Sequence, residues 1–145
     1  MPVSTFQELF AYYDWARGVL LSRAAALADE ALDKPFDMGP GSLRATLTHL
    51  YAAERHWFKR WCVDDGADPP RGRDLKSLPE LCEAWTVLAR RRNRFLSGAD
   101  RAALGRLVTF QDADGRDRTA TVRDTLLQVC NHGEHHRAQA LNMLR

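Results

Sequence analysis

Residues 131–137 read Asn-His-Gly-Glu-His-His-Arg and lie inside a long helical pattern near the C-terminus. His132 and His136 are four residues apart. On an α-helix this spacing puts both imidazoles on one face, one turn apart. Two neutral imidazoles placed in this way can chelate one divalent metal ion. The stretch therefore predicts a helix that carries a pair of candidate metal ligands.

The helix around this stretch is predicted to begin at Thr121 and to continue to about residue 143. Thr121 and Asp124 have the spacing of a capping box, which marks a helix N-terminus. Mostly apolar or small side chains recur every three to four residues on the face that also holds the two histidines: Val122, Thr125, Val129, Gly133, Ala140 and Met143.

Three earlier segments show the same helical periodicity, at residues 4–27, 42–61 and 77–98. Their apolar stripes include two charged members, Arg17 and Glu54. Four amphipathic helices of this length favour a four-helix bundle. Each segment begins at a serine that we expect to cap the helix: Ser4, with Gln7 three residues on; Ser42; and Ser77, with Glu80 three residues on.

Residues 104–121 have the pattern of a β-hairpin, with strands at 107–110 and 118–121. The turn over 112–115 is similar to a calcium-binding loop, but its glycine comes too early and no glutamate closes it. Residues 64–76 are polar and rich in Gly and Pro, which predicts a loop. The predicted fold class is all-α, a four-helix bundle with a small hairpin before the last helix.

The composition is that of an ordinary globular protein, and we expect one domain over residues 1–145. Hydrophobic residues make up 45% of the chain and charged residues 28%. The net charge of +2 does not favour nucleic acid as a partner. The one basic cluster, Arg90–Arg94, is predicted to be a solvated helix face.

No stretch approaches the roughly 20 apolar residues that span a membrane, and no signal peptide is indicated at the N-terminus. The three cysteines, Cys62, Cys82 and Cys130, are odd in number and widely spaced. This usage favours reduced thiols over a disulfide framework. We therefore expect a cytoplasmic protein with no membrane partner.

A third candidate metal ligand is His49, in the segment at 42–61. At 100° per residue it lies beside the apolar stripe, on a shoulder with Thr46 and Ala53, and such a shoulder can border a cavity between helices. Three histidines with open coordination positions are typical of catalytic rather than structural zinc. Spacing alone leaves the alternative of hydrogen-bonded or surface histidines open. No His-Glu-x-x-His or Glu-x-x-His motif is present.

Four pieces of the chain together resemble the DinB/YfiT-like superfamily, small bacterial metal-binding four-helix bundles. The resemblance covers nearly the whole chain, and the last piece is the most specific. The pieces are Tyr12-Tyr13-Asp14-Trp15-Ala16; Leu43 to Trp57, with the pattern Leu-Arg-x-Thr-Leu-x-His-Leu-x-x-Ala-Glu-x-x-Trp; the hairpin; and Asn131-His132-x-x-x-His136-Arg137-x-Gln139.

The resemblance implies that His49, His132 and His136 bind a divalent metal ion, for which we expect zinc or nickel. It also implies a bundle with long crossover connections that pairs into homodimers. We expect pairing through the helices at 4–27 and 42–61, with Trp15 or Trp57 contributing.

Other residues near the expected site have weaker claims. His135 is expected beside the site rather than as a ligand, and His56 is expected in solvent. Tyr13 and Glu134 are weak candidates for a catalytic role. Cys130 is expected to face away from the metal and not to act as a nucleophile.

Characterised relatives implied by the resemblance include thiol-dependent S-transferases and isomerases that use low-molecular-weight bacterial thiols. The predicted function is metal-dependent chemistry of that kind, with a small thiol and an electrophile as substrates. A metal-dependent hydrolase is the second hypothesis, because the same site can activate water. A non-catalytic metal-binding or stress-response protein is the third.

Overall fold

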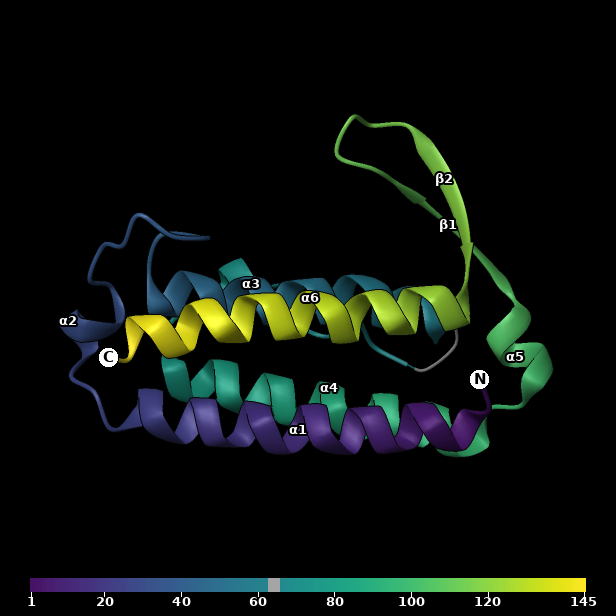
Figure 1. The fold of residues 1–145 in the computed structure, drawn as a ribbon, viewed down its shortest axis with the longest axis horizontal. Helices are drawn as coiled ribbons and strands as arrows, with labels where there is room; N and C mark the ends of the chain where they lie inside the picture. Colours follow the sequence, from purple (N-terminus) through teal and green to yellow (C-terminus); the bar gives the residue numbers. More distant parts are fainter. Residues whose placement is uncertain (63–65) are drawn as a thin grey trace.

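The computed structural model describes residues 1–62 and 66–145, and within them four long helices form a bundle (Figure 1). The predicted all-α bundle is confirmed. Asp64 and Asp65 of the predicted loop lie outside the described residues. The long helices are α1 (Val3–Ala25), α3 (Leu43–Trp61), α4 (Leu78–Gly98) and α6 (Val122–Met143). Three short helical turns were not predicted: α2 (Asp29–Leu32), η1 (Gly72–Asp74) and α5 (Arg101–Gly105).

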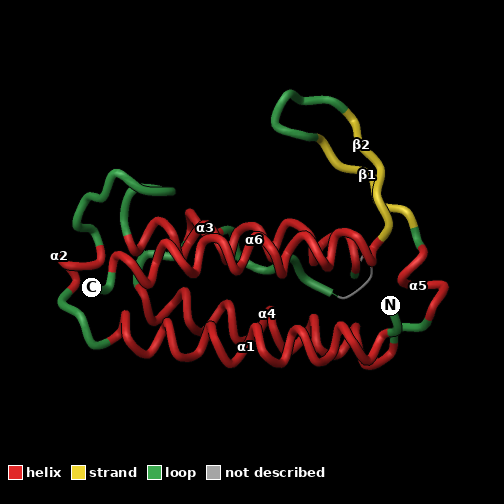
Figure 2. The backbone as a smooth tube through the Cα atoms, in the orientation of Figure 1, coloured by secondary structure: helices red, strands yellow, loops and turns green. Residues whose placement is uncertain are grey.

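The four long helices form two layers, with α1 beside α4 and α3 beside α6 (Figures 1 and 2). Helix α6 also packs against α1, and α4 also packs against α3. Helices α1 and α3 are therefore diagonal across the bundle. The fold of a single chain does not test the dimer surface expected on these two helices, so pairing through them stays a prediction.

The connection from α3 to α4 crosses back along the bundle. Arg55 donates a hydrogen bond to the carbonyl of Pro69, and Tyr51 donates one to the carbonyl of Pro70. The later residue of the connection, Pro70, thus contacts the earlier residue of α3, Tyr51. The connection therefore runs antiparallel to α3. This is a long crossover connection of the predicted kind, and it brings α4 into the same direction as α3.

Local cap signals identified three of the four helix starts. The side chains of Ser42, Ser77 and Thr121 each accept a hydrogen bond from a backbone N–H in the first turn of the helix that follows. The predicted cap at Ser4 is wrong, because α1 begins at Val3 with no side-chain cap. The amide of Gln7 instead donates to the carbonyl of Leu96 on α4, a tertiary contact that a local pattern does not reveal.

The predicted hairpin is confirmed as β1 (Leu107–Gln111) and β2 (Asp117–Thr121), which pair antiparallel. Gly115 in the turn has a φ of 76°, a conformation that glycine adopts without strain. The hairpin rises where α6 begins and curls back above the α3–α6 layer (Figure 2). Val108 is buried, and the Phe110 ring meets that of Trp57 edge to face, with centroids 4.8 Å apart.

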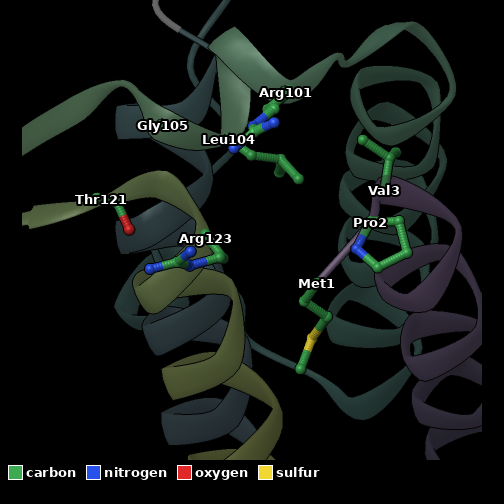
Figure 3. Close-up of a pocket in the computed structure, with 8 residues that line it drawn as sticks. All are labelled: Met1, Pro2, Val3, Arg101, Leu104, Gly105, Thr121 and Arg123. Carbon is green, nitrogen blue, oxygen red and sulfur yellow. The ribbon is translucent and has the colours of Figure 1, made fainter.

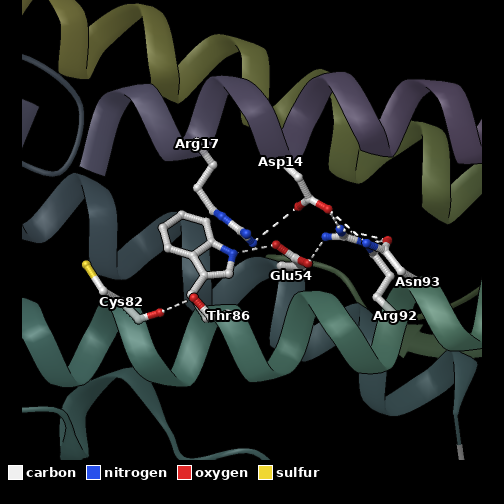
Figure 4. Close-up of polar contacts among 8 residues, drawn as sticks. Asp14, Arg17, Glu54, Cys82, Thr86, Arg92 and Asn93 are labelled. Atoms are coloured by element: carbon white, nitrogen blue, oxygen red, sulfur yellow. Dashed lines mark hydrogen bonds and ion pairs between the residues drawn. The ribbon is translucent and has the colours of Figure 1, made fainter. Parts of the chain in front are cut away.

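A buried ion cluster joins α1, α3 and α4 (Figure 4). Glu54 and Arg92 are fully buried and paired with each other. Trp85 donates to the second oxygen of Glu54 over 2.6 Å, and Arg92 donates to Asp14 over 2.6 Å. The prediction that Arg90–Arg94 forms a solvated face is therefore wrong at Arg92, because its guanidinium lies between two carboxylates inside the bundle.

Candidate metal centre

Three histidines converge where α3 packs against α6. His49 comes from α3, and His132 and His136 come from successive turns of α6. The Nε2 atoms of His49 and His132 are 2.9 Å apart. One nitrogen from each of the three rings lies within 4.8 Å of the other two, so the group can hold a metal ion. The structure brings together the three residues that the sequence singled out.

Gln139 orients one of these rings. The Nδ1 atom of His136 is 2.7 Å from Oε1 of Gln139, and the amide nitrogen of Gln139 is 3.2 Å from Nε2 of His135. With the amide oxygen accepting from Nδ1–H, the Nε2 atom of His136 is left with its lone pair free. Hydrogen bonds of this kind fix the tautomer of metal-binding histidines.

Gly39 leaves space for the Gln139 side chain, because it has no Cβ to meet the amide. Its φ is 51°, and a Cβ built at this position would lie 2.2 Å from Oε1 of Gln139. A side chain at this position would strain the backbone and displace the Gln139 amide, so glycine favours the observed arrangement. The sequence pattern includes Gln139 without giving it a role, and it does not single out Gly39.

The surroundings keep the imidazoles of His49 and His132 neutral. Partial burial, followed by the neighbouring histidines, lowers the pKa of His132 to about 4. Partial burial and then His136 also lower the pKa of His49. Neutral imidazole is the form that binds metal, so no proton has to leave these two rings at neutral pH.

The donor set fits a first-row transition metal rather than a hard cation. Three imidazole nitrogens suit zinc, nickel or copper, whereas magnesium and calcium prefer oxygen ligands. Tetrahedral zinc with bonds of about 2.0–2.1 Å would separate its nitrogens slightly more than the 2.9 Å between His49 and His132. Three protein ligands leave at least one position open, as in catalytic zinc sites.

Two hollows meet at His49, one with arginines in its lining and one without. One has a volume of about 700 Å³, and its lining includes Asp33 and four arginines: Arg44, Arg55, Arg71 and Arg73. The other, which we call the hairpin cleft, has a volume of about 380 Å³ and reaches His132 as well. Its walls include Ala53, Trp57, Phe110 and Gln128. Two of the three candidate ligands therefore face a cleft large enough for a small organic molecule.

A third hollow, of about 520 Å³, lies at the other end of α6, between the start of α1 and helix α5 (Figure 3). Arg101 and Arg123 border it. Its lining, among the described residues, contains no histidine, cysteine or carboxylate, so it offers neither a metal ligand of these kinds nor an evident nucleophile.

The remaining predicted residues lie around the centre in different ways. His135 is exposed and touches Gln139, and His56 is exposed, both as expected. Tyr13 is buried against Gly133, between Arg92 and Arg137, and burial raises its pKa far above the usual value.

Glu134 pairs with Arg137 on the surface of α6. The catalytic roles of Tyr13 and Glu134 stay predictions. Cys130 is half-buried, and burial raises its pKa to about 11, which fits the expectation that it is not a nucleophile.

Comparison with known proteins agrees with this architecture. The model of the DinB family matches residues 1–145. The chain belongs to the DinB family. This DinB-family chain is also 23% identical to Protein DinB of Bacillus subtilis (strain 168), over 95% of its own length and 83% of that relative. Across the part of the chain that the structure describes, no helix has both the length and the apolar character to cross a membrane.

Proposed function

We propose that this chain is a divalent-metal-dependent enzyme that activates a low-molecular-weight thiol for S-transfer or isomerisation. The observation that carries the proposal is the convergence of three imidazoles beside an open cleft. We assign metal binding to His49, His132 and His136, with zinc or nickel as the ion, and one domain over residues 1–145. A bound ion supplies positive charge that lowers the pKa of a thiol.

The protonation states of the protein's own residues favour a nucleophile supplied by the substrate thiol. Burial raises the pKa of the Cys82 and Cys130 thiols, so both are protonated at neutral pH. The raised pKa of Tyr13 keeps its phenol protonated, so it does not act as a general base at neutral pH. The neutral imidazoles leave the charge of the ion undiminished. We place the reaction in the cytoplasm, where small thiols are kept reduced.

The ligand assignment is tested on untagged protein purified without a nickel column. We expect near-stoichiometric zinc or nickel by elemental analysis, and loss of most of it in His132→Ala and in His136→Ala. His135→Ala is the matched control, because its ring lies on the same turn but outside the group. Full metal retention in both ligand variants would rule the centre out.

The reaction class is tested by mixing metal-loaded protein with panels of thiols and electrophiles. We expect conjugation or isomerisation that collapses in His49→Ala. The open centre also suits water activation, which makes a metal-dependent hydrolase the second candidate. Ester or amide hydrolysis without thiol turnover would select it. Fully loaded protein that is inactive in both assays would favour a non-catalytic metal-binding role.

A further inference from the structure

The hairpin cleft is built from three elements around His49 and His132. On α3, Ala53 and Trp57 follow His49 at intervals of four residues, so they extend along the same helix face. On α6, Gln128 precedes His132 by four residues. Phe110 of the hairpin closes the end opposite the histidines through its contact with Trp57.

The size of the cleft is set by small residues. Ala52 and Ala53 both line it, and each leaves room that a longer side chain on α3 would fill. The resulting volume of about 380 Å³ lies at the small end of the range for ligand sites in proteins, roughly 300–1,000 Å³. A molecule of one or two rings fits such a space.

The walls of the hairpin cleft are largely uncharged, although the Arg60 guanidinium lies 6.0 Å from the centroid of the Trp57 ring, one of those walls. Among the described residues, the lining of the hairpin cleft contains no Asp, Glu, Lys or Arg. It offers the rings of Trp57 and Phe110, the side chains of Ala52, Ala53 and Val129, the amides of Gln111 and Gln128, and the imidazoles of His49, His56 and His132. The arginine-lined hollow on the other side of His49 has the opposite character. In the metal-free cleft, a charged substrate would lose water without gaining a counter-ion from the lining.

We propose that the hairpin cleft binds the electrophilic substrate, and that this substrate is a small uncharged molecule with a flat apolar body. The Trp57 and Phe110 rings hold that body, and its reacting end points to the open side of the histidine group. The assignment of the bound molecule as the electrophile rests on the proposed function. The existence of the binding site does not, because the cleft walls are formed by the protein alone.

The test measures binding of 1,3-dinitrobenzene, an unreactive uncharged ring, to metal-free and metal-loaded protein by calorimetry and amide NMR. We expect saturable binding in both forms, with shifts at the indole of Trp57 and the amide of Gln128. The indole of Trp15 should not shift. In the metal-free protein, the anionic 3,5-dinitrobenzoate should bind at least about tenfold more weakly, a difference of about 1.4 kcal/mol.

Two variants locate the site. Ala53→Leu keeps a good helix former but fills the cleft, so it should weaken probe binding by at least about tenfold. Phe110→Leu removes one aromatic wall and should weaken it by about three- to tenfold. Ala11→Leu, the same substitution at an exposed position of α1, is the control. Circular dichroism confirms that each variant is folded.

The outcomes separate this inference from the proposed function. Probe binding that Ala53→Leu abolishes supports the cleft, even if no thiol turnover is found. Turnover without probe binding, or binding that Ala53→Leu leaves unchanged, overturns the cleft and spares the metal chemistry. Equal or tighter binding of the anion to the metal-free protein overturns the assignment of an uncharged substrate.

Discussion

At the residue scale, the turn of α6 that carries the histidines depends on a glycine within it. Gly133 lies directly after His132, and a Cβ at this position would lie 2.3 Å from Cε2 of Tyr13. The Tyr13 ring cannot retreat easily, because Arg92 and Arg137 lie 5.8 and 5.0 Å from its centroid. The close approach of α1 to α6 at this level therefore requires glycine.

We expect Gly133→Ala to destabilise the protein by about 1–3 kcal/mol, the usual range for overpacking a core. Alanine is the better helix former by about 1 kcal/mol, so intrinsic propensity alone predicts the opposite sign. Gly18→Ala in α1 is the matched control, since a Cβ there meets nothing within 4 Å. Urea unfolding that shows both variants equally stabilised would contradict the packing argument.

The Gln139 side chain supports a second residue-scale prediction. Gln139→Leu removes the acceptor from Nδ1 of His136 without touching the ligand nitrogens. We expect metal affinity to fall by about 10- to 100-fold, as is typical when the hydrogen-bond partner of a metal-binding histidine is lost. Competition with a chromogenic chelator measures this change. His135→Ala, which contacts the other end of the amide, should change affinity little.

At the element scale, the ion cluster decides how α1, α3 and α4 pack together. Arg92 is fully buried between Glu54 and Asp14. Removing one member of a buried ion pair leaves the other charge without compensation, at a cost of about 3–5 kcal/mol. We expect a loss of this size for Arg92→Leu. Arg90→Leu, an exposed neighbour on the same helix, should change stability by less than about 0.5 kcal/mol.

Chemical denaturation of both variants measures the difference between these two positions. Equal, small losses would show that the cluster contributes little and that apolar packing alone holds α4 in place. A large loss for Arg92→Leu would also explain why a charged residue, Glu54, occupies an otherwise apolar stripe.

Elements whose signals are local could be predicted from the sequence. The caps at Ser42, Ser77 and Thr121 and the hairpin turn depend on residues within a few positions of each other, and they are confirmed. The burial of Arg92 could not be predicted, because its partner Glu54 lies 38 residues away. The short helices α2 and α5 have four and five residues, too few for a periodicity to show.

The residues of the candidate site also divide into those that local spacing predicts and those that it does not. His132 and His136 reveal themselves by helical spacing, whereas His49 gained its place mainly from the family resemblance. The hairpin cleft was not foreseen, because the contact between Trp57 and Phe110 exists only once the hairpin folds back. The helical spacing of aromatic residues does not show which of them line a cleft.

At the scale of the whole molecule, α1 presents an apolar surface that the single chain does not cover. Tyr12, Trp15 and Val19 are 55%, 64% and 43% exposed and share one face of the helix. The Arg137 guanidinium lies 5.9 Å from the Tyr12 ring, so this face adjoins α6. Trp57, the other aromatic expected in a dimer, packs against Phe110 within its own chain.

We therefore expect a two-fold homodimer through the α1–α6 face, with Trp15 near its centre. Trp15→Glu should convert the protein to a monomer at micromolar concentration, as measured by light scattering. Val87→Glu, at an exposed apolar position of α4, should leave the dimer intact. A wild-type protein that is already monomeric under these conditions would contradict the prediction.

The histidine group also has a consequence for the stability of the folded chain. His49 and His132 are 83 residues apart in sequence. An ion could bind between them only after folding has brought these distant residues together, so it would stabilise the folded state rather than restrict the unfolded one. The gain is about 2.7 kcal/mol when the free ion is at 100 times its Kd. Metal binding would then stabilise the folded chain reversibly. Removal of the ion by a chelator should make the protein more susceptible to proteolysis.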